Sequence, residues 1–294
     1  MFRIVLFLAT NAAVLLLASI VFSVFGLDQY SVDGRSLNLQ SLLIFSALFG
    51  MGGSFVSLLL SKWMAKRSTG AKVIDQPGNQ TEQWLLSTVR QLAERAGIAM
   101  PEVAIFPAEQ PNAFATGASK DKALVAVSSG LLQNMNAGEV EAVLGHEIGH
   151  VANGDMLTLT LIQGVMNTFV LFFARIIGFF VDRVLLKNDR GFGIGYFVTV
   201  IVAQIALTFL AAIVVNWFSR YREFRADKAG AELAGRNKMI SALERLKIAT
   251  QQPEAMPDTL VAFGITDGIK SGIQKLFSTH PPLDARIAAL RQTA

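Results

Sequence analysis

Four long apolar blocks constrain the fold of this chain more than any other feature. The first two, Ile4–Leu27 and Leu39–Ser61, contain no charged residue, and the last two occupy 156–180 and 191–219. About 20 apolar residues in a helix are enough to cross a hydrocarbon core roughly 30 Å thick. Because only 16% of the residues are charged, we predict an α-helical membrane protein with four transmembrane helices.

The third block is the least regular, since Gln163, Asn167 and Arg175 interrupt it. Two interpretations stay open for the third and fourth blocks: two full spans, or a hairpin that is only partly embedded. The first block is interpreted as a retained span, because its apolar core is too long for a signal peptide and no clear cleavage site follows. Gly50 and Gly53 in the second block indicate either close helix packing or a kink.

Basic residues flank the hairpins and predict their orientation. They follow the second block as Lys62, Lys66 and Arg67, and the fourth block as Arg220, Arg222 and Arg225. The positive-inside rule places both sets in the cytoplasm. We therefore predict a transmembrane hairpin at 1–61, the first half of a cytoplasmic domain at 62–155, a second hairpin at 156–219, and the other half of the domain at 220–294.

The polar segments predict a mixture of helices and short strands. Strands are expected at 102–106 and 123–127. Helices are expected at 79–97, 136–153, 216–235 and 237–250, with a last one beginning at Pro282. Two of them open with capping-box spacing, Asn79 with Glu82 and Asn136 with Glu139. The cytoplasmic domain is therefore predicted to contain both helices and strands.

One motif carries chemistry: His146-Glu147-Ile148-Gly149-His150, inside the predicted helix 136–153. Histidines four residues apart share one helical face, so both imidazoles can reach one Zn²⁺ ion. Because the chain has no Cys, further ligands must be His or carboxylates. Glu147 is placed to take a proton from a water that attacks a carbonyl. The alternative is a pair of ordinary helix-surface histidines.

A catalytic zinc site needs a third protein ligand. We predict Glu223, with Asp227 on the same helical face supporting a ligand imidazole through a hydrogen bond. The alternative is that both acids only pair with Arg222 and Arg225. Two spans between the motif and Glu223 return the chain to the same side of the membrane, as a shared ion requires.

These features together resemble the HtpX family of bacterial membrane zinc proteases, relatives of the CAAX prenyl endopeptidases. The resemblance covers essentially the whole chain, and 111–117 and 279–282 also match the family's pattern. It implies an α+β gluzincin-type fold for the cytoplasmic domain and one Zn²⁺ per chain. It further implies a multi-pass protein of the bacterial inner membrane whose zinc site faces the cytoplasm. It also implies an endopeptidase that cleaves membrane or misfolded proteins in quality control under stress.

Several further residues have two interpretations each. With the resemblance, His280 is a donor to the oxyanion of the reaction; otherwise it is a structural loop residue. Asp155 is interpreted as a helix-boundary residue, with a functional role as the alternative. Arg286 either supports the His280 loop or lies on a helix surface. The substrate backbone is expected to pair with an edge formed by Asn112, Ala113 and Phe114, unless these residues form a plain turn.

Two other functions compete with proteolysis of membrane proteins. A prenyl-protein endopeptidase would use the same catalytic residues but needs a larger intramembrane chamber. A non-enzymatic zinc-dependent membrane scaffold would need a closed fourth ligand position. The expected partners are protein substrates and the lipid bilayer, with homo-oligomers left open. Nucleic acid is not expected, because no basic face with interleaved aromatic residues is present.

Overall fold

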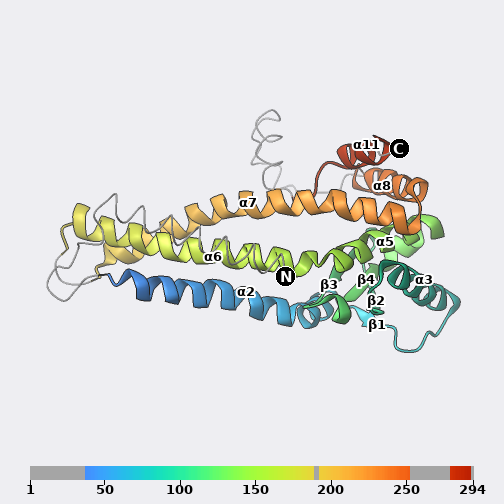
Figure 1. Cartoon of the computed structure of the whole chain (residues 1–294), viewed down its shortest axis with the longest axis horizontal. Coiled ribbons are helices and arrows are strands. Elements are labelled where there is room, and N and C mark those ends of the chain that lie inside the picture. Colours follow the sequence, from blue (N-terminus) through green and yellow to red (C-terminus); the bar gives the residue numbers. More distant parts are fainter. Residues whose placement is uncertain (1–36, 189–191, 252–278, 293–294) are drawn as a thin grey trace. The chain divides into compact units, whose positions relative to one another are not determined.

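The computed structural model describes residues 37–188, 192–251 and 279–292, so the first predicted span, Ile4–Leu27, lies outside the described residues. Among the described residues, three helices are long and apolar enough to cross a membrane (Figure 1). They are α2 (Leu39–Thr69), α6 (Asp155–Phe180), which a π-helical turn continues over Val181–Leu185, and α7 (Ile194–Ala234). These helices contain the second and third apolar blocks and residues 194–219 of the fourth.

The described chain divides into two compact units. The first contains the described residues up to Ser57 together with Thr158–Val215, and it is helical. The second contains Leu58–Leu157 and the described residues from Asn216 onward, and it holds all four strands. The domain boundaries expected above stay a prediction.

Close backbone packing joins α2 to α6 in the helical unit. A Cβ placed on Gly50 would lie 2.7 Å from the Cα of Thr168, and one placed on Gly164 would lie 3.3 Å from the Cα of Met51. The absence of side chains at both positions therefore permits the close approach. Arg175 does not interrupt α6, because its guanidinium donates to the Leu171 carbonyl at 2.9 Å within the helix.

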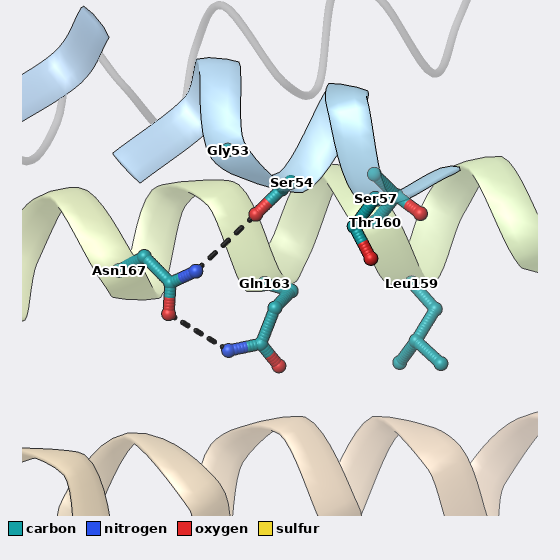
Figure 2. Close-up of a pocket in the computed structure, with 7 residues that line it drawn as sticks. All are labelled: Gly53, Ser54, Ser57, Leu159, Thr160, Gln163 and Asn167. Atoms are coloured by element: carbon teal, nitrogen blue, oxygen red, sulfur yellow. Dashed lines mark hydrogen bonds between the residues drawn. The ribbon is translucent and has the colours of Figure 1, made fainter. Parts of the chain in front are cut away.

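A chain of polar side chains also links these two helices (Figure 2). Gln163 donates to Asn167 Oδ1 at 2.9 Å, and Asn167 donates to the hydroxyl of Ser54 at 3.3 Å. These residues line a cavity of about 270 Å³ together with Gly53, Ser57, Leu159 and Thr160. Polar groups that look out of place in the apolar sequence therefore bond to one another within the protein.

The second unit is built on a four-stranded sheet of order β1-β2-β4-β3. Its strands are β1 (Lys72–Val73), β2 (Glu102–Phe106), β3 (Ala113–Thr116) and β4 (Leu124–Ser128). β2 and β4 are parallel, whereas β1 and β3 pair antiparallel with β2 and β4 respectively. Every residue of the inner strand β4 is buried, and β3 forms one edge of the sheet.

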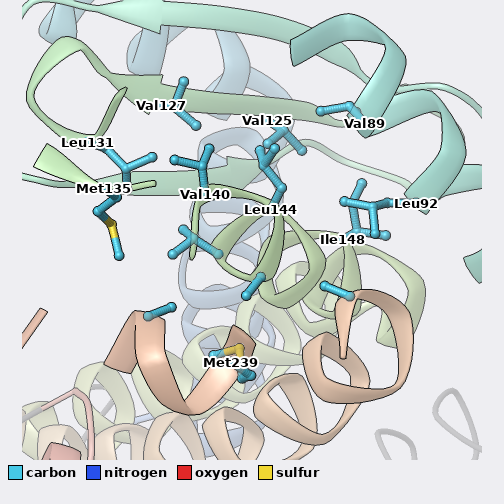
Figure 3. Close-up of a cluster of buried hydrophobic side chains, with 14 of the residues drawn as sticks. Val89, Leu92, Val125, Val127, Leu131, Met135, Val140, Leu144, Ile148 and Met239 are labelled. Carbon is cyan, nitrogen blue, oxygen red and sulfur yellow. The ribbon is translucent and has the colours of Figure 1, made fainter. Parts of the chain in front are cut away.

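Helices cover this sheet and confirm most of the helical predictions. They are α3 (Gln80–Ala96), α4 (Ser129–Asn134), α5 (Ala137–Asn153), α8 (Arg236–Gln251) and α11 (Leu283–Gln292), with a 3-10 turn η2 (Lys120–Lys122) before β4. Figure 3 shows the apolar core, where side chains of α3, β4, α5 and α8 meet around Leu144 and Ile148. The motif helix α5 is therefore held at the centre of the unit.

Candidate metal centre

The helix that carries the motif has defined ends and a buried surface. Asn136 and Glu139 form a reciprocal capping box at its start, and Gly154 ends it in a left-handed conformation with φ 63°. Leu144 and Ile148 are fully buried in the apolar core. His146, Glu147 and His150 are buried as well, so the motif does not consist of surface histidines.

Glycines bring α7 close to this helix. Gly145 and Gly149 are four residues apart and lie on one face of α5. A Cβ on Gly149 would lie 2.7 Å from the Cβ of Ala229, and one on Gly145 would lie 3.3 Å from the Cα of Gly230. Larger side chains there would push the two helices apart. The close approach brings Glu223 of α7 to the two histidines.

Three donor groups converge at this place. His146 Nε2 lies 3.1 Å from His150 Nε2, and Glu223 Oε1 lies 3.2 Å from His150 Nε2. The second oxygen of Glu223 lies 3.6 Å from His146 Nε2. One ligand atom from each residue can be chosen so that all lie within 4.8 Å of one another. The distances suit a single ion shared by the three side chains.

Carboxylates on the far side of each imidazole fix its orientation. His146 Nδ1 donates to Asp227 at 2.9 Å, and His150 Nδ1 donates to Asp155 at 2.8 Å. With both Nδ1 atoms protonated, the Nε2 lone pairs of His146 and His150 point into the space they share with Glu223. This is the tautomer that ligand histidines adopt in metal sites.

The chemistry of this donor set fits a cation. Glu223 is fully buried, and its Oε1 makes no hydrogen bond among the described residues. Two imidazole lone pairs and a carboxylate would repel one another unless positive charge lay between them. The residues therefore fit the metal ion that the motif predicts.

The electrostatics of the site favour positive charge strongly. Burial alone lowers the pKa of His146, but hydrogen bonds to Asp227 and Glu223 outweigh it and raise that pKa to about 9. Burial likewise lowers the pKa of His150, while Asp155 and Glu223 raise it above its ordinary value. Without a metal ion, protons supply the positive charge that the carboxylates demand.

Arg286 stabilises the carboxylate that orients His146. Its Nε donates to Asp227 Oδ2 at 2.7 Å and its Nη2 donates to Oδ1 at 2.5 Å, while its Nη1 lies 3.3 Å from Glu223. Burial alone would raise the pKa of Asp227, but bonds from Arg286 and His146 hold it below the usual range. Arg286 is buried, so it is not a surface arginine.

The remaining predicted site residues lie around this centre. Glu147 adjoins His146, and its charge helps to raise the pKa of both histidines. His280 is exposed, and its Nδ1 lies 2.7 Å from Glu223 Oε2. Asn112 donates its backbone N–H to the Ser128 hydroxyl at 2.9 Å. Ala113 and Phe114 begin the edge strand β3, which packs against α5.

Two residues of the centre escaped the sequence interpretation. Asp155 was interpreted first as a boundary residue, yet its side chain is almost fully buried against His150. The αL residue Gly154 turns the chain so that the next carboxylate faces back toward the helix. The sequence did contain a signal for this role, because Asp155 directly follows Gly154, the glycine that ends the motif helix. No local pattern distinguishes Arg286 from other helix arginines.

Comparisons with known proteins identify the family of the chain. Residues 79–294 match the model of peptidase family M48. A protein of Hahella chejuensis named protease HtpX is 63% identical over 290 residues, covering 99% of each chain. The proteins of the same name from Thioalkalivibrio sulfidiphilus and Pseudomonas fluorescens are each 60% identical, over 98% and 99% of both chains.

A solved structure supports the fold. The crystal structure of S. mikatae Ste24p matches with a TM-score of 0.59 at 18% identity, over 98% of this chain and 64% of that one. At this identity the match speaks for the fold alone. Family membership rests on the M48 match and on the relatives of bacterial origin. The chain therefore belongs to peptidase family M48, among the HtpX proteases, and is a bacterial membrane metalloprotease.

Proposed function

We propose that this chain is a zinc endopeptidase of the bacterial inner membrane, with its site facing the cytoplasm, that cleaves membrane or misfolded proteins in quality control. The single observation that carries the proposal is the buried trio of His146, His150 and Glu223, whose lone pairs converge. Nitrogen and carboxylate donors without thiolates suit Zn²⁺ in a catalytic site. When bound there, zinc would polarise the scissile carbonyl and acidify a water.

Glu147 is proposed as the general base. It precedes Ile148, which is fixed in the core, so its backbone position is rigid. In this role its carboxylate takes the proton from the attacking water and then delivers it to the departing amine. The two histidines, each held by a buried carboxylate, stay in the tautomer that leaves Nε2 for the ion.

Substrate binding is proposed along β3. An edge strand offers backbone groups to an extended peptide, which would add to the sheet beside Asn112, Ala113 and Phe114. This arrangement presents the peptide alongside α5, the helix that carries Glu147. His280, adjacent to Glu223, is proposed to donate a hydrogen bond to the oxyanion, a contribution worth about 10²–10³ in rate.

The test compares Glu147→Gln with Glu141→Gln in the purified full-length chain. Glu141 lies on the same helix but pairs with Lys238 at the surface of the unit. We expect Glu147→Gln to keep one zinc per chain and to lose at least about 10²-fold in casein cleavage. Glu141→Gln should retain both. Undiminished cleavage by Glu147→Gln, or an active chain free of metal, would overturn the proposal.

A further inference from the structure

Exposed aromatic side chains lie on two of the apolar helices, α2 and α7, close to where their uncharged blocks end. Trp63 on α2 is 64% exposed, and Trp217 and Tyr221 on α7 are 62% and 56% exposed. The last two stack with their ring centroids 6.2 Å apart and their planes within 15°. All three belong to the second unit, and we call them the aromatic collar.

The collar has the composition of a membrane interface. Trp and Tyr concentrate where lipid headgroups meet water, because their rings are apolar with one polar atom. Each member of the collar lies within two residues of the end of an uncharged apolar block, which is Ser61 in α2 and Ser219 in α7. Basic residues adjoin these ends, Lys62 and Lys66 on α2 and Arg220 and Arg222 on α7. Such exposed aromatic residues are costly in water unless an apolar phase meets them.

The two collar residues of α7 lie a short distance along the chain from Glu223, a member of the candidate metal centre. Glu223 follows Trp217 by six residues and Tyr221 by two in the continuous helix α7. At a rise of about 1.5 Å per residue, these separations amount to about 9 Å and about 3 Å along the helix axis. A ligand of the ion therefore lies less than two turns from the interface marker.

A second element ties the centre to the membrane border independently. The buried carboxylate of Asp155 accepts the hydrogen bond from His150, and the next residue, Met156, begins the third apolar block. Both helices that supply ligands thus reach an apolar segment within a few residues of the donor set.

We propose that the aromatic collar holds the catalytic centre at the bilayer surface, so that the enzyme takes peptide bonds lying within a few residues of a transmembrane helix. This inference rests on the proposed function and narrows its substrate class to juxtamembrane segments. An extended peptide spans about 3.3–3.6 Å per residue, so about three residues cover 9 Å. Four further residues of the substrate would pair with β3, which has four residues.

The depth of the collar can be measured without any cleavage. The chain has three tryptophans, and the third, Trp84, packs against the soluble core as a matched control. Three single-tryptophan variants, with the other two changed to Phe, are reconstituted with lipids brominated at shallow or deep acyl positions. We expect shallow bromines to quench Trp63 and Trp217 most strongly and Trp84 hardly at all. Equal quenching of all three, or strongest quenching by deep bromines, would overturn the proposal.

The distance between the membrane and the bonds that the enzyme can cleave is tested with a reporter protein that has a single transmembrane helix. Its transmembrane helix is followed by a Gly/Ser spacer, a fixed casein segment and a folded domain, with spacers of about 0, 5, 10 and 20 residues. We expect cleavage at the shortest spacers as well as the longest, because the needed span is about 9 Å. Glu147-dependent cleavage that appears only at about 20 residues would defeat the surface position while leaving the protease assignment intact. If no reporter were cleaved, both the surface position of the centre and the proposed protease function would be refuted.

Discussion

Replacing Asp155 should weaken metal binding in two graded steps. His150 donates to this carboxylate at 2.8 Å, and Asp155 is only 1% exposed. Asn has the same shape and can still accept the imidazole N–H, but it removes the charge that makes the ring a better donor to the ion. Ala removes the partner altogether and leaves the N–H of a buried ring unsatisfied.

The size of the effect follows from the surroundings. Loss of such a supporting partner costs about 10–100-fold in metal affinity, which is about 1.4–2.8 kcal/mol. Arg225 lies 3.8 Å from the other oxygen of Asp155, but it is exposed, so it offsets little of that carboxylate's charge. We expect about 10-fold weaker zinc binding for Asp155→Asn and about 100-fold for Asp155→Ala.

Zinc affinity is measured by competition with a chromophoric chelator at fixed pH, using purified full-length chain. Asp121→Asn, at an exposed position, is the matched control and should bind like the parent. Thermal melts of the metal-free variants report whether each still folds. The reasoning is refuted if folded Asp155→Asn and Asp155→Ala both bind zinc within about twofold of the parent.

Three more perturbations probe the same centre. Gly149→Val should lower the stability by about 1–3 kcal/mol, because the new side chain pushes α5 away from Ala229. The control Gly138→Ala, in more open space, should lower it less, and thermal melting curves measure both. Arg286→Met should lower the stability of the metal-free chain by about 3–5 kcal/mol, because it leaves the buried Asp227 carboxylate without its arginine partner. The control Arg291→Met, which breaks an exposed ion pair, should change the stability by less than about 1 kcal/mol. In the metal-free chain the pKa of His146 is raised from 6.5 to about 9, so protonation of His146 stabilises the folded state. This stabilisation is complete below pH 6.5 and is lost as pH rises through 9, which removes about 3 kcal/mol from the free energy of unfolding. Denaturation midpoints that rise over this pH interval would contradict the prediction. Over the same interval zinc, which competes with that proton, should bind more tightly as pH rises.

Local patterns predicted the elements well. The capping box at Asn136 and the glycine after Asn153 predicted the bounds of α5, and Asn79 and Gly97 did the same for α3. These signals depend on residues within one turn of each helix end, so no tertiary contact is needed to recognise them. The two-residue strand β1 has no such signal and is held by pairing with β2. Helix α4 has a capping residue, Ser128, but only six residues, too few for an apolar periodicity to stand out.

The candidate site was predictable only in part. The spacing of His146 and His150 could be recognised because both lie on one helix. Glu223 could be proposed as their partner because it is an acidic residue shortly after the fourth apolar block. The approach of α5 to α7 depends on Gly145 and Gly149 on one helix and Gly230 on the other, more than 80 positions apart in the sequence, so no local pattern contains it. Arg286 reaches Asp227 from a helix near the end of the described chain, so only the folded arrangement identifies it.

The distribution of the donors along the chain has a consequence for biosynthesis. His150 and Glu223 are separated by the whole second hairpin, and the guanidinium that steadies Asp227 comes from Arg286. While the ribosome is still making these later segments, the growing polypeptide has two of its donors and no complete centre. We therefore expect the three donors and Arg286 to come together only after the hairpin and the last helix have been synthesised.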